Sequence, residues 1–300
     1  MATFDIPHLD IDDPEQVVGE LGELDPALIA AQQRAIALLE GLDVTDVTAQ
    51  RLAWLILWSQ LFAAIRGVQA AVVFRSRLLL ESTWRFTFEV FLHLQAIIEP
   101  ALVDDEKAAD TTAQAGRADE VDRRLTAFSA WCLWNDDHHI DWMMDPRTIE
   151  SLGSLTERSD LEADLSALRS QRQEIWGLMD TETLDPWIRK MDRRRDGPDE
   201  RHVFSFYELL GLETTSVSQR LIRLNSGASI GAYSRASVVL HGSTANHFLD
   251  VEAGEVTPRL RDGADVESAA TPYITVGLEL LGEIKPFLWP AAPASGTATG

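Results

Sequence analysis

The sequence predicts an all-α fold, a multi-helix bundle with a central buried helix near residues 70–98. The chain has 300 residues with 45% hydrophobic content, which is enough for a sizeable core. Between residues 47 and 99, glycine and proline are sparse and the apolar positions follow helical spacing. No series of alternating strands and no repeat of fixed period is present, so a β architecture and a solenoid are not favoured.

The first helix is predicted from signals at both of its ends. In "DPALIAAQQRAIALLEGL", Asp25 is placed as the N-cap, Pro26 at the first helical position and Gly41 just after the end. We assign residues 1–44 to an N-terminal helical arm.

Two long helices are predicted next, over about 48–66 and 70–98. Gly67 lies near the predicted break, and Pro100 follows the predicted end of the second helix. The second of these is the expected central helix of an all-helical domain over residues 45–288.

In the remainder of that domain, an acidic, alanine-rich segment near residues 101–119 is predicted to be a loop or an exposed helix edge, and residues 189–201 are predicted to be a charged connection. Residues 289–300, "WPAAPASGTATG", are predicted to form a disordered tail. Further helices are expected in the segments 121–145, 160–179, 205–212, 214–225, 229–242 and 271–289.

Charge and cysteine content exclude several classes of protein. Lys plus Arg number 26 against 48 Asp plus Glu, a net charge of −22, which disfavours loose binding to nucleic acid or anionic lipid. RNA would therefore have to bind a local basic site, for which the run "RKMDRRR" at 189–195 is the best candidate. The single Cys132 excludes an internal disulfide and fits a reducing compartment.

A cytoplasmic protein without a membrane partner is expected. The N-terminus is acidic and lacks the layout of a signal peptide. The longest strongly apolar run without a charge, Leu52–Ile65, is shorter than the roughly 20 residues that span a bilayer.

The common motifs of nucleotide and metal enzymes are absent. The sequence contains no GxxxxGK[ST], GxGxxG, HExxH, CxxC or GxSxG. We therefore expect no cofactor and no metal.

A ladder of charged residues with four-residue spacing runs along the predicted central helix. A step of four advances the helical face by only about 40°, so its members form one slowly drifting ridge. The ridge is either a solvent-facing series of i,i+4 pairs or the lining of a polar interior seam, in which each charge would need its partner. Its members are Arg77, Glu81, Arg85, Glu89 and His93.

A second constellation lies in "YSRASVVLHG". On a helix, Ser237 and His241 share a face, and Tyr233 lies four residues before Ser237. His241 followed by Gly242 fits a helix C-terminus, where histidine complements the dipole. The alternative makes His241 an acid or base near neutral pH, with Arg235 supplying a fixed charge for a phosphate.

These two segments together resemble an uncharacterised, mainly bacterial all-helical family, domain of unknown function 5677. Its members combine an "RSxxE"-type helix with a later "YxxxSxxxHG" segment. In this chain the corresponding segments are "RSRLLLES", with Arg75, Arg77 and Glu81, and "YSRASVVLHGS", with Tyr233, Ser237 and His241. The resemblance implies a helical fold but no activity.

Arg235 and His241 more loosely resemble the R-x4-6-H motif of the higher-eukaryote-and-prokaryote nucleotide-binding (HEPN) superfamily. Many of its members are metal-independent ribonucleases that form homodimers around the site. The resemblance implies proton transfer by the histidine, stabilisation of phosphoryl charge by the arginine and a homodimer. Ala236 departs from the polar residue usual after the arginine.

A third cluster, "DDHHID" at Asp136–Asp141, offers oxygen and imidazole ligands for a divalent metal. It would need further ligands from another helix. Without them, it is a polar helix face between Trp134 and Trp142.

Two functions are compatible with these patterns. In the first, the protein is a metal-independent ribonuclease or nucleotide-handling protein with Arg235 and His241 as catalytic residues. In the second, it is a non-catalytic sensor or defence-associated interaction module. In the non-catalytic case, a set of supporting polar residues forms a structural network that fixes helix register. These residues are Arg75, Arg77, Glu81, Tyr233 and Ser237.

Overall fold

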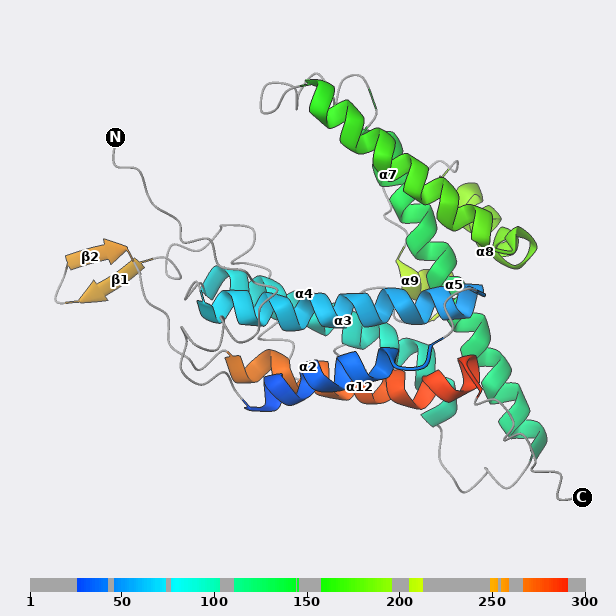
Figure 1. Ribbon diagram of the computed structural model, residues 1–300, viewed down its shortest axis with the longest axis horizontal. Helices are drawn as coiled ribbons and strands as arrows, with labels where there is room; N and C mark the ends of the chain where they lie inside the picture. The colour runs from blue at the N-terminus through cyan, green and yellow to red at the C-terminus, as the bar shows by residue number, and fades with distance from the viewer. Residues whose placement is uncertain are drawn as a thin grey trace, which may run out of the picture. The chain divides into compact units, whose positions relative to one another are not determined.

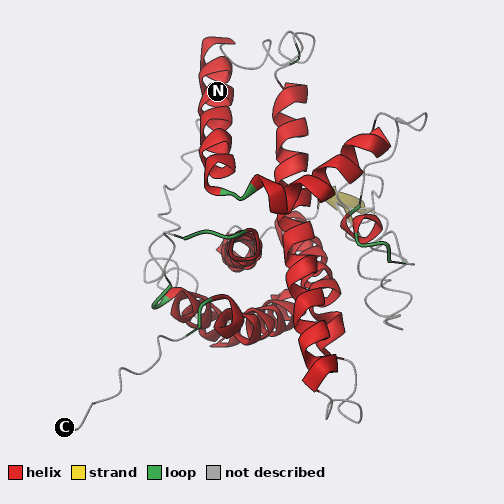
Figure 2. Cartoon of the chain, turned by 90° about the vertical axis from the view of Figure 1, so that its right-hand side faces the viewer, coloured by secondary structure: helices red, strands yellow, loops and turns green. Residues whose placement is uncertain are grey.

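The described part of the chain is almost entirely helical, which confirms the predicted all-α fold (Figures 1 and 2). The computed structural model describes residues 26–42, 46–73, 77–102, 111–143, 145, 158–195, 205–212, 249–252, 255–258 and 267–290. The helices are α2 (Pro26–Leu39), α3 (Ala49–Val73), α4 (Arg77–Ile98), the 3-10 helix η1 (Glu99–Leu102), α5 (Thr111–Met143), α7 (Arg158–Leu178), α8 (Thr181–Arg195), α9 (Phe206–Leu209) and α12 (Glu267–Leu288).

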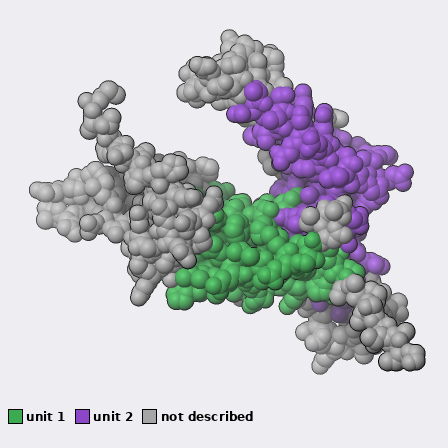
Figure 3. Space-filling model, in the orientation of Figure 1, with its two compact units in different colours: residues 1–42, 56–95, 217–300 green, residues 43–55, 96–216 purple. Residues whose placement is uncertain are grey.

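The chain divides into two compact units (Figure 3). Unit 1 comprises residues 1–42, 56–95 and 217–300, and unit 2 comprises residues 43–55 and 96–216. The helix of the predicted N-terminal arm therefore belongs to unit 1, together with α12 from the far end of the sequence.

In unit 1, α2 and α12 lie side by side (Figure 1). Arg34 pairs with Glu279 at 3.2 Å, and the Lys285 ammonium donates to the carbonyl of Glu40 at 2.9 Å. Both contacts join residues 245 positions apart, so the two helices run in the same direction. The predicted end of α2 is confirmed by Gly41, which has a φ of 71°, a conformation that favours glycine.

Aromatic packing joins α12 to α4. Tyr273 lies edge-on to Phe88 with ring centroids 4.8 Å apart, and it also contacts Trp84 and Phe91. Edge-to-face pairs of this kind add to the energy of area burial. This cluster fixes the start of α12 against the middle of α4.

Gly67 lies inside α3 and does not end a helix, so the predicted break at Gly67 is wrong. A Cβ at this position would lie 2.7 Å from the Thr83 Oγ1 atom of α4. Glycine is therefore present because α4 approaches the backbone of α3 closely.

Replacing Gly67 by alanine is expected to lower the free energy of unfolding by about 1–3 kcal/mol. The Thr83 hydroxyl already donates to the Leu79 carbonyl at 2.8 Å, which limits its freedom to move away. The control is Gly177→Ala in α7, where nothing lies within 4 Å of the new Cβ and helix propensity predicts a gain of roughly 0.5–1 kcal/mol. Urea denaturation of both variants tests this; equal shifts would contradict it.

Helix α3 also has the length and composition of a membrane span. It is the one described helix with these properties, over Ala49–Val72, with mean hydropathy 1.4. Its side chains at Trp54, Leu57, Leu61 and Ile65 are fully buried within the protein. Of the apolar window as a whole, 39% is buried within the protein.

In unit 2, the long helix α5 is the element against which the others pack. It contacts α7, α8, α9 and η1. Phe128 and Trp131 of α5 pack on Phe206 of α9, with ring centroids 5.1 and 5.9 Å from it. A capping box between Ser205 and Glu208 begins α9 and so positions Phe206.

The structure decides one open alternative and differs from the sequence prediction at two places. Helix α5 begins at Thr111, so residues 111–119 of the predicted acidic segment are helix and not loop. Most of the predicted charged connection is the last turns of α8, because Leu184 and Met191 bury one face of that helix in spite of its charge. A short antiparallel hairpin, β1 (Leu249–Glu252) with β2 (Glu255–Pro258), was not predicted.

Candidate functional site

The residues proposed for catalysis from the sequence fall outside the described residues. This holds for Arg75 and for the whole second constellation, whose members are Tyr233, Arg235, Ser237 and His241. Arg77 and Glu81 lie on the first two turns of α4, where only the backbone is described. Their convergence into one site stays a prediction.

The C-terminal half of the charge ladder is described. Arg85 and Glu89 form an i,i+4 pair at 3.1 Å, with 26% and 32% of their side chains exposed. One turn later the Nδ1 atom of His93 is buried, and burial lowers the pKa of His93 from 6.5 to about 4. The ladder therefore passes from a partly exposed ion pair to a histidine of intermediate exposure whose Nδ1 atom is buried.

A polar cluster with a buried arginine lies between α5 and α7. The Asp137 carboxylate accepts from Arg172 at 2.7 Å through one oxygen and from the Trp176 indole at 3.0 Å through the other. Arg172 also donates to the Leu133 carbonyl and lies over the Trp176 ring, 5.2 Å from its centroid. We call these four residues the α5–α7 network.

Arg172 is buried to an unusual degree for an arginine, with 6% of its surface exposed. Within the described part of the chain, its Nε and Nη1 atoms are buried and make no hydrogen bond. Asp137 retains 41% exposure of its side chain. Asp137 is the direct ion-pair partner of the guanidinium, which also interacts electrostatically with Asp136, whereas Asp137 also contacts solvent.

The α5–α7 network was missed by sequence reasoning, although a signal for it exists. Leu165, Arg172 and Met179 are spaced by seven residues, and all three are buried. Two apolar residues at heptad spacing predict that the residue between them shares their buried face.

The candidate metal cluster at Asp136–Asp141 uses its side chains in other ways. Asp137 belongs to the α5–α7 network, and Asp141 pairs with Arg169 at 3.2 Å. The His138 ring stacks on Trp134, and its Nδ1 atom lies 2.8 Å from the Trp134 carbonyl oxygen. Among the described residues, no group of three His, Cys, Asp or Glu side chains could hold a metal ion.

Cys132, one turn before Asp136, is a free cysteine. Burial first, and then the Asp136 carboxylate, raises the pKa of its thiol. Burial also raises the pKa of Asp136 itself. A thiol with a raised pKa is a poor nucleophile, so Cys132, which is intermediate in exposure, lacks the character of a reactive cysteine.

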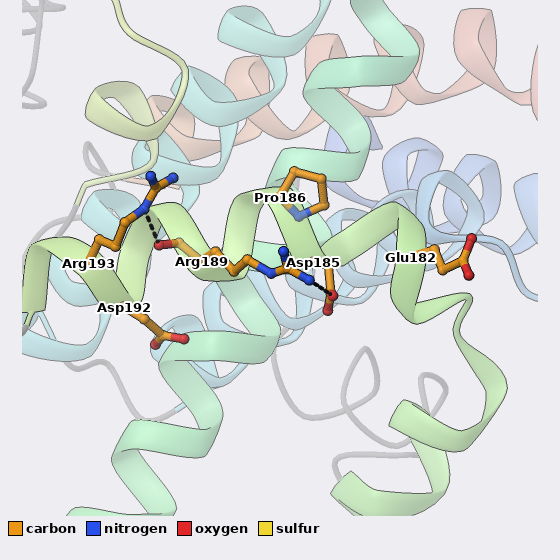
Figure 4. Close-up of a pocket in the computed structure, with 6 residues that line it drawn as sticks. All are labelled: Glu182, Asp185, Pro186, Arg189, Asp192 and Arg193. Atoms are coloured by element: carbon orange, nitrogen blue, oxygen red, sulfur yellow. Dashed lines mark hydrogen bonds and ion pairs between the residues drawn. The ribbon is translucent and has the colours of Figure 1, made fainter.

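The basic run predicted from the sequence lies partly along a groove of about 680 Å³ on one face of α8 (Figure 4). Arg189 pairs with Asp185 at 2.7 Å, and Arg193 donates from Nε to the Arg189 carbonyl at 3.0 Å. Lys190 turns to the Leu209 carbonyl of α9 at 2.6 Å. The groove is therefore lined by charges of both signs and is not a purely basic surface.

No protein-family model, curated protein or solved structure matches this chain. The resemblances drawn from the two sequence segments stay predictions.

Proposed function

We propose that the chain is a non-catalytic helical interaction module that works in the cytoplasm. The observation that carries this proposal is the α5–α7 network, in which both oxygens of Asp137 are engaged by Arg172 and Trp176. In the described part of the chain, the Asp136–Asp141 segment, which is rich in aspartate and histidine, thus contributes to holding α5 and α7 together. Such a network favours one helix register, the property that a binding surface requires.

Two other reactive side chains support the same conclusion. A general acid or base works best when its pKa is near the operating pH. His93, with a pKa of about 4, is neutral at pH 7, and the Cys132 thiol has its pKa raised by burial. Neither is suited to proton transfer or nucleophilic attack at neutral pH.

A second candidate function is favoured by the spacing of Arg235 and His241. In this alternative the protein is a metal-independent ribonuclease of the HEPN type. It would also be a member of the helical family called domain of unknown function 5677. His241 would transfer the proton, Arg235 would stabilise the phosphoryl charge, and RNA would dock on a local basic site.

A ribonuclease assay separates the two functions. With purified protein, EDTA present and several RNAs, we expect no cleavage by the wild type and none by His241→Ala. The melting temperature of both proteins is measured alongside to show that they are folded. Cleavage by the wild type that is lost in His241→Ala would reject the interaction module in favour of the ribonuclease.

A further inference from the structure

One stripe of α8 carries a charge pattern that changes sign along the helix. Its residues recur at steps of three and four, so they share a face, and they line the groove described above (Figure 4). The lining consists of Glu182, Asp185, Pro186, Arg189, Asp192 and Arg193. Glu182 and Asp185 occupy the first half, and Arg189 and Arg193 occupy the second half, where Asp192 lies between the two arginines.

These charges are accessible to another molecule. The side chains of Arg189 and Asp185 are 73% and 48% exposed, and Glu182 and Arg193 are exposed as well. Within the described residues, Arg193 uses only its Nε atom, on the Arg189 carbonyl, which leaves its two terminal amino groups for a partner. Asp192 accepts from the Trp134 indole at 2.9 Å and is therefore held toward α5.

We infer that this stripe binds a second copy of the chain, with the two α8 helices antiparallel about a two-fold axis. A two-fold contact requires a self-complementary surface. If one residue of the first copy contacts a second residue of the other copy, the same two residues are also in contact with the copies exchanged. Reversing α8 brings Glu182 opposite Arg193 of the other copy and Asp185 opposite Arg189. Antiparallel helix dipoles favour the same orientation.

The charge order selects a copy of this chain over an unrelated protein. The occupant must be basic at one end and acidic at the other, with the same helical spacing, and α8 meets these conditions by symmetry. The net charge of −22 makes two copies repel at long range, so contact requires local pairs of opposite sign. The arginines of α8 provide them.

The size of the surface limits the strength of the dimer. Helix α8 has 15 residues and is therefore about 22 Å long. One helix pair of this length buries less than the roughly 1,200 Å² at which stable interfaces begin. The dimer is thus weak and concentration-dependent, and it is independent of whether the chain cleaves RNA.

A charge-exchange experiment tests the interface. Sedimentation equilibrium of the full chain is run from micromolar to near-millimolar concentration on the wild type, on Glu182→Lys/Asp185→Lys and on Arg189→Glu/Arg193→Glu. We expect the wild type to dimerise, each double variant to be monomeric, and an equal mixture of the two variants to dimerise again. Circular dichroism checks that the helix content is unchanged.

The matched control is Asp164→Lys/Glu174→Lys, which changes the net charge as the first variant does but on exposed positions of α7. It is expected to dimerise at least as well as the wild type. A wild type that stays monomeric at every concentration overturns the inference. So does a wild-type-like dimer in either α8 variant, and so does a mixture that fails to reassociate.

Discussion

Replacing Asp137 by alanine is expected to lower the free energy of unfolding by about 2–3 kcal/mol. Arg172 would keep its contact with the Leu133 carbonyl but lose its only charged partner in the α5–α7 network. An uncompensated buried charge is strongly destabilising, by about 3–5 kcal/mol for a fully buried pair. The partial exposure of Asp137 places the expected loss below the range for a fully buried pair.

Urea denaturation followed by circular dichroism measures this loss, with Asp185→Ala as the control. The Arg189–Asp185 pair has the same 2.7 Å separation as the Arg172–Asp137 pair, but both of its side chains are exposed. Surface pairs contribute about 0–1 kcal/mol, so the control should change little. Equal effects at the two positions would show that burial of Arg172 is unimportant.

A compensating substitution makes the physical cause testable. In the Asp137→Ala background, Arg172→Met should recover most of the lost stability, because methionine fills similar space without a charge. If the loss instead came from the broken hydrogen bond to Trp176, then Arg172→Met would recover nothing. The recovery therefore identifies the buried charge as the cause.

How far the sequence predicts this fold depends on whether a signal is local. Pro26 and Gly41 mark the ends of α2 because their backbone preferences act within one turn, and the structure confirms the helix between them. Gly67 misleads because its cause is tertiary: the close approach of Thr83 from another helix is invisible in a sequence window. Local propensity alone would place a break there.

The candidate site was predicted less completely than the fold, for a related reason. The four-residue ladder correctly predicts that Arg85 and Glu89 meet, since i,i+4 contacts follow from helix geometry alone. The partners of Asp137 come from α7, and a single sequence does not state which helix packs on which. Burial of His93 likewise depends on the packing of unit 1 around α4.

His93 is expected to contribute to a fall in the free energy of unfolding between pH 6.5 and pH 4. Burial lowers the pKa of His93 from 6.5 to about 4. Between these values, the unfolded chain binds a proton that the folded chain does not, so the unfolding free energy decreases as the pH falls. The full contribution, reached near pH 4, is about 3 kcal/mol, since one pKa unit corresponds to about 1.4 kcal/mol.

Comparing the wild type with His93→Gln isolates this effect from the titration of the many carboxylates. Urea denaturation of both proteins at pH 7.5 and 4.5 should show a smaller loss of stability in the variant, because glutamine takes up no proton. His139→Gln, at an exposed position of α5, serves as the control and should follow the wild type.

Glu120 does not confuse the result. A hydrogen bond from Arg123 is the main reason that its pKa is lowered from 4.5 to about 2, so its stabilising contribution is lost chiefly below pH 4.5. That window overlaps the one assigned to His93 only between pH 4 and pH 4.5, and Glu120 is present in both of the proteins compared. An identical change with pH in the wild type and in His93→Gln would therefore mean that the imidazole of His93 is accessible to protons in the folded chain.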